Sequence, residues 1–237
     1  MNWKEDNYQA IAASKTPHDI VDFLKNEVSR LGMKDMSWVI QLPIPVLEDR
    51  VLVFHTYSAS WAEEYWKNNY LGVDPTVRHC MTSVVPVLWS ETSIDPTSTF
   101  WENARAHGLY EGIATPVRDR HGACSMLTMS RDSLEFTQSE LAEKMPKIAL
   151  LSQLVHAGMT NLIFRTELPE ISTGVLTKRE KEVIKLAAAG MTSEEMAKRL
   201  SISVSGANFH VNKVIGKLGA KNKVDAAVKA IVLDLVN

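Results

Sequence analysis

Residues 176–223 read LTKREKEVIKLAAAGMTSEEMAKRLSISVSGANFHVNKVIGKLGAKNK and decide the fold of the C-terminal part of the chain. Two capping boxes lie in this stretch: Thr177 stands three residues before Glu180, and Thr192 stands three residues before Glu195. In a capping box the threonine hydroxyl accepts from the N3 amide while the glutamate accepts from the cap amide, so each pair begins a helix. Helix, tight turn and helix in succession indicate a helix-turn-helix.

Glycine and serine residues divide the same stretch into four short helices. Gly190 and Gly219 each follow an apolar periodic run and supply left-handed stops for the first and third helices. Ser203 caps the third helix, and a final helix is predicted from about Lys223 to Leu235. The third helix carries an apolar stripe at the spacing of one helical face: Ala207, Val211, Val214 and Leu218.

The opposite face of the third helix has side chains that suit DNA. Asn208 and Asn212 lie one turn apart, and a side-chain amide can pair with the N6/N7 edge of adenine. Lysines at the helix edge suit phosphates, which position a protein without reading sequence. Taken singly, such a face is also typical of a solvated helix. The candidate DNA-binding residues are Ser205, Asn208, Phe209, Asn212, Lys213 and Lys217.

The distribution of charge separates this region from the rest of the chain. The formal net charge is −2, but residues 174–237 hold 11 Lys and Arg against 6 Asp and Glu, leaving 15 basic and 22 acidic residues before them. A basic piece on an acidic body indicates a polyanion partner for that piece alone. The sign changes near TELPEISTG, residues 166–174, so we expect domains at 1–165 and 175–237 joined by this linker.

Composition limits the class of protein. The 237 residues are 45% hydrophobic and 23% charged, which is typical of a globular protein large enough for two domains. No apolar run predicts a membrane span, and the N-terminus lacks a signal-peptide pattern. Cys80 and Cys124 are too few for a disulfide framework, so a cytoplasmic location is expected. No metal-ligand spacing or nucleophile motif is visible.

The N-terminal part mixes helix and strand patterns. Runs rich in β-formers are Met36–Leu42, Arg50–Thr56, Gly112–Val117 and Ala123–Ser130, the last two joined as a hairpin. The predicted fold class is α+β: an α-β-α sandwich around an antiparallel sheet, followed by a four-helix, all-α helix-turn-helix domain.

Two helices flank these strands in the sequence. Thr16-Pro17 begins the first, which Gly32 ends. A third capping box, from Thr137 to Glu140, begins a long helix toward Phe164, and Pro146 is expected to kink or restart it.

Aromatic side chains gather in YSASWAEEYWKNNYLGVDPTVRH, residues 57–79. Tyr57, Trp61 and Tyr65 recur every four residues on one side of a helix, and Trp89 completes the set. Aromatics at helical spacing are more often core packing than a ligand site. However, a carboxylate at Asp74 beside such a wall is costly unless something donates to it, and an apolar ligand with an amide would meet that need.

Residues 176–223 resemble the LuxR-type helix-turn-helix domain. The shared pattern is Leu176-Thr177-x-Arg179-Glu180-x-Glu182-Val183, Gly190-x-Thr192, Glu195-x-Ala197, Leu200-x-Ile202-Ser203, Phe209-His210-Val211 and Lys217-Leu218-Gly219. One departure is Gly206-Ala207, where the family has Thr-Val at the start of the third helix. Glycine weakens the helix by ~1 kcal/mol relative to alanine and removes a hydroxyl that could contact phosphate.

The N-terminal part resembles the autoinducer-binding domain of quorum-sensing LuxR-family regulators. The motif W-x-x-x-Y-x(8)-D-P fits Trp61, Tyr65 and Asp74-Pro75, Gly112 falls at a further family position, and Ala114 replaces a polar residue of some relatives. The resemblance implies that an N-acyl-homoserine lactone binds between sheet and helices. The ligand-binding residues that it implies are Tyr57, Trp61, Tyr65, Asp74, Trp89 and Thr128.

The same resemblance implies a role for each residue. The Trp61 indole N–H donates to the lactone carbonyl, and Asp74 accepts from the ligand amide. Tyr57 and Thr128 hold the amide carbonyl, Trp89 packs on the lactone ring, and Tyr65 lines the pocket near the acyl chain. The residues expected to set the volume for that chain are Trp38, Ile40, Leu52, Phe54 and Met126.

The expected function is a quorum-sensing transcription regulator that binds an acyl-homoserine lactone and, as a homodimer, promoter DNA. RNA polymerase is a further candidate partner; no cofactor, metal, membrane contact or enzymatic activity is expected. Candidate dimer contacts, with intradomain core as the competing interpretation, are Ile148, Leu151, Leu154 and Val155, or Val228, Ile231 and Leu235. The alternatives left open are an orphan LuxR-type regulator that answers another small molecule or none, and an acyl-lactone-cleaving enzyme.

Overall fold

The computed structural model describes residues 3–42, 51–92, 99–120, 122–132, 135–167, 176–233 and 235–236. The chain divides into two compact units: residues 1–41, 51–118 and 123–162 form the first, and the second includes residues 163–237. Across the described ranges, no helix has the length and apolarity needed to cross a membrane.

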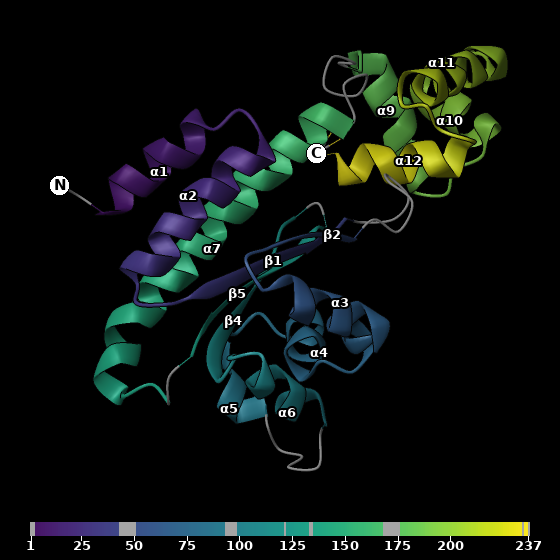
Figure 1. Ribbon diagram of the computed structural model, residues 1–237. Coiled ribbons are helices and arrows are strands. Elements are labelled where there is room, and N and C mark those ends of the chain that lie inside the picture. Colours follow the sequence, from purple (N-terminus) through teal and green to yellow (C-terminus); the bar gives the residue numbers. More distant parts are fainter. Residues whose placement is uncertain are drawn as a thin grey trace. The chain divides into compact units, whose positions relative to one another are not determined.

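The first unit contains a five-stranded antiparallel sheet in the order β2-β1-β5-β4-β3 (Figure 1). Its strands are β1 (Asp35–Gln41), β2 (Val51–His55), β3 (Val87–Leu88), β4 (Glu111–Arg118) and β5 (Cys124–Arg131). Four of these strands and the β4–β5 hairpin confirm the predictions. The sequence did not predict β3, because two residues are too short to show an alternating pattern.

Helices cover both faces of this sheet, which confirms the predicted α-β-α sandwich (Figure 1). One face carries α1 (Trp3–Ala13), α2 (Pro17–Arg30) and α7 (Gln138–Glu167). The other face carries α3 (Ala59–Lys67), the 3₁₀ turn η1 (Tyr70–Gly72), α4 (Pro75–Thr82), α5 (Trp89–Thr92) and α6 (Thr99–Ala106).

The long helix α7 begins at the predicted capping box, where the Glu140 amide donates to Thr137 Oγ1 over 3.2 Å. It continues through Pro146 to Glu167 as one helix, so the restart offered as one effect of this proline was wrong, and the kink offered as the other stays a prediction. Proline removes one backbone bond, but Ile148, Leu151 and Val155 are fully buried and hold the helix in place. These three are therefore core residues and not dimer contacts. The predicted linker is helical at residues 166–167, and its remainder, 168–174, lies outside the described residues.

From residue 176 on, the described part of the second unit contains the four predicted helices: α9 (Lys178–Ala188), α10 (Ser193–Leu200), α11 (Val204–Lys217) and α12 (Lys223–Val232). Both capping boxes are present, with Thr177 at the start of α9 and Thr192 at the start of α10. Gly190 and Gly219 have φ values of +82° and +54°, as left-handed helix stops require. The apolar stripe of α11 is buried in the core of this unit, as predicted: Ala207, Val211, Val214 and Leu218.

Candidate functional site

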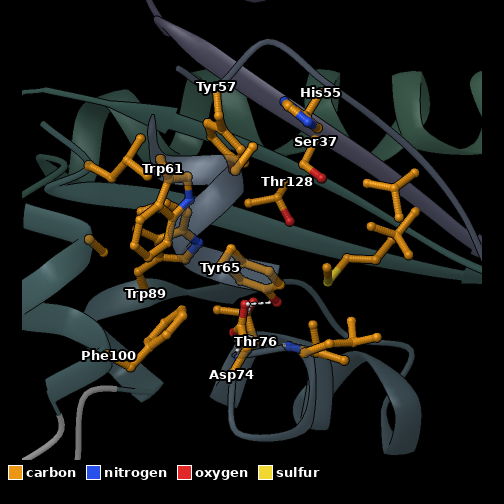
Figure 2. A pocket seen from close by; sticks show the side chains of 18 of the residues that line it. Ser37, His55, Tyr57, Trp61, Tyr65, Asp74, Thr76, Trp89, Phe100 and Thr128 are labelled. Atoms are coloured by element: carbon orange, nitrogen blue, oxygen red, sulfur yellow. Dashed lines mark hydrogen bonds between the residues drawn. The ribbon is translucent and has the colours of Figure 1, made fainter. Parts of the chain in front are cut away.

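A cavity lies in the first unit between the sheet and helices α3–α6 (Figure 2). All six residues that the sequence resemblance singled out line it: Tyr57, Trp61, Tyr65, Asp74, Trp89 and Thr128. They come from three elements, α3, α5 and β5, and from the segments just before α3 and α4, yet the fold brings them to one place. Tyr57 precedes α3, so its predicted place on that helix was wrong. The cavity is therefore the candidate small-molecule site.

Helix α3 supplies the aromatic wall. Ser58 caps this helix by accepting from the Trp61 amide at 3.2 Å, which fixes the first turn. Trp61 is only 3% exposed, and its ring centroid lies 5.8 Å from that of Tyr65 and 6.0 Å from that of Phe100. The rings of Trp61 and Trp89 lie on the same side of the cavity (Figure 2). This wall is both a packed aromatic cluster and the surface of a cavity.

Asp74 is the buried charge of the site. As the N-cap of α4, its Oδ1 accepts from the Thr76 amide at 2.8 Å and from Thr76 Oγ1 at 2.7 Å. Its Oδ2 accepts from the Tyr65 hydroxyl at 3.0 Å, the bond drawn in Figure 2. Burial raises the pKa of this carboxyl, although the hydrogen bonds from Thr76 and Tyr65 oppose the rise. The chain thus partly meets the need for donors that the sequence indicated.

Thr76 is a site residue that sequence reasoning missed. It is buried, lines the cavity and donates twice to Asp74. A signal was available, because Asp followed by Pro is a typical N-cap and first-turn pair, and the cap side chain accepts from an amide two residues on.

A polar group without a partner lies on β5. Thr128 Oγ1 is buried and has no hydrogen-bond partner in the described part of the chain, and it points into the cavity (Figure 2). Ser37, its partner across the β1–β5 ladder, lines the same cavity. A buried hydroxyl without a partner costs roughly 1–3 kcal/mol. The cavity therefore favours a polar ligand group beside Thr128.

Gly112 on β4 explains how Trp89 can lie where it does. A Cβ at residue 112 would come within 2.5 Å of Trp89 Cε2 and 2.9 Å of the Met129 carbonyl oxygen. Only glycine leaves room for the indole at its observed position.

The predicted volume-setting residues were mostly wrong. Of the five, only Met126 lines the cavity. Phe54 instead has its ring centroid 5.9 Å from that of His18 in α2, on the other side of the sheet, and 6.1 Å from that of Trp38. Successive strand residues point to opposite faces, so the prediction chose the wrong parity. The residues of β1 and β2 that face the cavity are Ser37, Val39, Val53 and His55.

A second cavity adjoins the first and shares wall residues with it: Val39, Leu71, Val77 and Met126. Its other walls include Cys80, Met81 and Cys124. Ala114 is fully buried and packs with Cys80, Val87 and Met126, so its surroundings are apolar. Burial raises the pKa of the Cys80 thiol to about 12, which leaves it neutral and apolar in character.

The second candidate site is the exposed face of α11. Ser205, Asn208, Asn212 and Lys213 are exposed there, and Phe209 is 57% exposed. Asn208 Oδ1 accepts from Ser193 Oγ on α10 at 2.6 Å, and Lys213 Nζ lies 5.6 Å from the Phe209 ring centroid. Lys217 differs from the others, because its Nζ donates to the buried carboxylate of Glu180 at 2.7 Å.

Comparison with family models assigns both units. The model described as "Autoinducer binding domain" matches residues 16–159, and the model described as "Bacterial regulatory proteins, luxR family" matches residues 174–230. Together they span both candidate sites.

Individual relatives align along most of their length. The transcriptional activator protein SolR of Ralstonia nicotianae is 35% identical over 98% of each chain. The HTH-type quorum-sensing regulator RhlR of Pseudomonas aeruginosa is 32% identical over 90% of this chain and 88% of its own. A crystal structure of Escherichia coli SdiA is similar with a TM-score of 0.80, at 27% identity, covering 99% of this chain and 98% of that one. A structure of SdiA in complex with octanoyl-rac-glycerol has a TM-score of 0.74 at 26% identity over 97% and 93% of the two chains.

Proposed function

The chain belongs to the LuxR family of quorum-sensing transcriptional regulators, and from this premise we propose that its effector is an N-acyl-homoserine lactone. The observation that carries the proposal is that Asp74 and Thr128 line the same cavity. Asp74 offers a buried carboxylate oxygen, and Thr128 offers a buried hydroxyl that has no partner within the described chain. A secondary amide has one donor and one acceptor, and it complements both.

We assign the ligand amide N–H to Asp74 Oδ2. A carboxylate oxygen accepts more than one hydrogen bond, and the single bond from Tyr65 leaves room for a second donor. Tyr65 thereby orients the carboxylate as well as lining the cavity. On the other side of the amide, Thr128 and Tyr57 donate to the ligand carbonyl.

The remaining cavity walls suit the two ends of such a ligand. Trp61 donates its indole N–H to the lactone carbonyl, and Trp89 packs on the lactone ring. The acyl chain extends into the adjoining cavity past Val77 and Met126, where most of the walls are apolar and the Cys80 thiol is neutral.

A second effector class follows from a related structure. SdiA has been seen with octanoyl-rac-glycerol, which carries an acyl chain but no amide. An acyl glycerol could place its hydroxyl groups near Thr128 and Asp74 of this chain. The two classes differ at Asp74, because only the lactone brings an amide N–H to the carboxylate. A regulator that needs no effector is the third possibility.

We propose that residues 175–237 bind promoter DNA through α11 in a homodimer, which also contacts RNA polymerase. Lys213 meets phosphate, while Asn208, Asn212 and Phe209 face base edges. Since Asn208 Oδ1 already accepts a hydrogen bond from Ser193 Oγ, Asn208 presents its amide N–H groups to DNA. Ile231, which is 52% exposed on α12, is the dimer contact. Residues 1–165 form the effector domain, and 166–174 link the two.

Regulation of transcription, and no enzymatic reaction, is the activity proposed, since the relatives are transcriptional regulators. The proposed location is the cytoplasm, where a bacterial regulator meets its operator DNA. Thermal melting of the full chain tests the effector. A lactone bound only by the folded form must raise the melting temperature with concentration by mass action. No shift with any acyl lactone would overturn the proposal, and a shift with acyl glycerol alone would favour the second class.

A further inference from the structure

We propose that His107 is a positioning residue, which holds the indole of Trp61 in the orientation needed to donate to the ligand. This inference rests on the proposed function, because it concerns the Trp61 N–H and the ring carbonyl of the lactone.

His107 lies at the end of α6 and reaches across to α3. The backbone ends the helix there, with Gly108 at a φ of +79° and the Leu109 amide donating to the Ala104 carbonyl at 3.0 Å. The imidazole Nε2 lies 2.8 Å from Glu64 Oε2, and Nδ1 lies 3.3 Å from Ser60 Oγ. Both ring nitrogens therefore bond to residues of α3, and these residues flank Trp61 in the sequence.

The ring held in this way packs on Trp61. The His107 and Trp61 ring centroids lie 5.4 Å apart at an interplanar angle of 46°. On its other sides Trp61 meets Tyr65, Tyr70 and Phe100, each within 6.0 Å between centroids. Tyr65 and Tyr70 are each anchored by their hydroxyl alone, to Asp74 and Asn103, and the Phe100 ring makes no hydrogen bond. His107 is the neighbour whose own position is set by two directional bonds.

The hydrogen bond between His107 and Glu64 also joins two walls of the cavity. Helix α3 carries Trp61 and Tyr65, whereas α6 carries Phe100, Trp101 and Ala104. The side chains of His107 and Glu64 are 21% and 31% exposed, so this bond lies at the edge of the unit and not in its core. A polar contact at the edge of a unit contributes little to stability. We therefore expect loss of this contact to alter the direction of the Trp61 N–H more than the stability of the fold.

The test compares two ligands with the same acyl chain in the full-length protein. One is N-octanoyl-homoserine lactone, and the other is N-octanoyl-cyclopentylamine, which lacks the ring carbonyl. His107→Phe keeps the aromatic packing but removes both tethering nitrogens. We expect it to weaken lactone binding about fivefold, the size of one neutral hydrogen bond, and to leave binding of the cyclopentyl amide unchanged. Arg105→Gln, an exposed change on α6, is the matched control and should bind both ligands as wild type does.

Two further variants keep the result interpretable. Glu64→Ala removes the shorter of the two tethers and leaves the imidazole with its bond to Ser60, so it should give a lactone-selective loss no larger than that of His107→Phe. In a Trp61→Phe background, His107→Phe should cost nothing more. Equal losses for both ligands, or an undiminished loss in that background, would overturn the role of His107. If Trp61→Phe alone left lactone affinity unchanged, the Trp61 assignment in the proposed function would fail, and this inference would fail with it.

Discussion

The Tyr65 hydroxyl donates to Asp74 Oδ2 at 3.0 Å, while Thr76 occupies Oδ1. The buried carboxylate is therefore held on both oxygens before any ligand arrives. Because the Asp74 carboxylate is already oriented, the ligand N–H can bind to it without the entropic cost of ordering this side chain. This arrangement has consequences for the pH dependence of binding and for mutation of the site.

Ligand binding should weaken in acid. Burial raises the pKa of Asp74, so the folded apo protein holds this proton more tightly than the unfolded chain does, and the cost of burying the charge is complete once pH has risen through the raised pKa. The ligand amide N–H instead needs the charged form. The ligand-induced gain in melting temperature should therefore shrink as pH falls through this raised pKa. In Asp74→Asn the ligand should raise the melting temperature only slightly, and by the same amount at every pH. A wild-type gain that does not change with pH would contradict the account.

Gly112→Ala should damage the site by moving Trp89. The added methyl would lie 2.5 Å from the indole, which must shift toward the cavity. Overpacking of this kind costs typically about 1–3 kcal/mol of stability, and here we also expect loss of ligand affinity. Isothermal titration and thermal unfolding measure the two effects.

Gly158→Ala is the matched control for that variant. Its Cβ would come within 2.4 Å of Ile11 Cγ2, in a helix that covers the other face of the sheet. It should lower stability similarly but leave the affinity of the folded protein for ligand unchanged. If the two variants changed affinity equally, the effect on Trp89 would not be specific.

Lys213 and Lys217 should behave differently although both lie on α11. Lys213→Ala removes an exposed cation. The slope of log affinity for DNA against log salt concentration should therefore become shallower by about 1, the contribution of one phosphate contact. Lys217→Ala leaves the buried Glu180 without its cation and should cost roughly 1–3 kcal/mol of stability in the second unit. An unchanged melting temperature for Lys217→Ala would show that this lysine is not structural.

Local signals explain most of what the sequence predicted. The caps at Thr16, Thr177 and Thr192 and the stop at Gly190 act within one helical turn, so each can be read without knowing the fold. Four of the five strands were predicted for the same reason, and the two-residue β3 was not. The aromatic residues of α3 were singled out by their spacing, but their roles came from the family resemblance.

Contacts between distant residues explain what was missed. The ion pair of Lys217 with Glu180 was missed, because Glu180 lies 37 residues earlier and nothing near Lys217 in the sequence indicates the contact. The His107–Glu64 contact joins residues 43 positions apart, so no local sequence pattern could predict it either. Which face of β1 and β2 meets the cavity also depends on tertiary packing, since both faces are covered by helices and neither alternates clearly between polar and apolar. Hence Val39 was missed in favour of Ile40.

The central claim, that Asp74 accepts the amide hydrogen of an acyl lactone, is tested most directly by changing one ligand atom. The affinity of N-octanoyl-homoserine lactone should be compared with that of its ester analogue, in which oxygen replaces the N–H. A hydrogen bond to a charged group contributes about 1.5–3 kcal/mol, so wild type should prefer the amide by roughly 10- to 150-fold. Asp74→Asn, which retains an N-cap oxygen for α4, should fold and lose that preference. Equal binding of amide and ester by wild type would contradict the account.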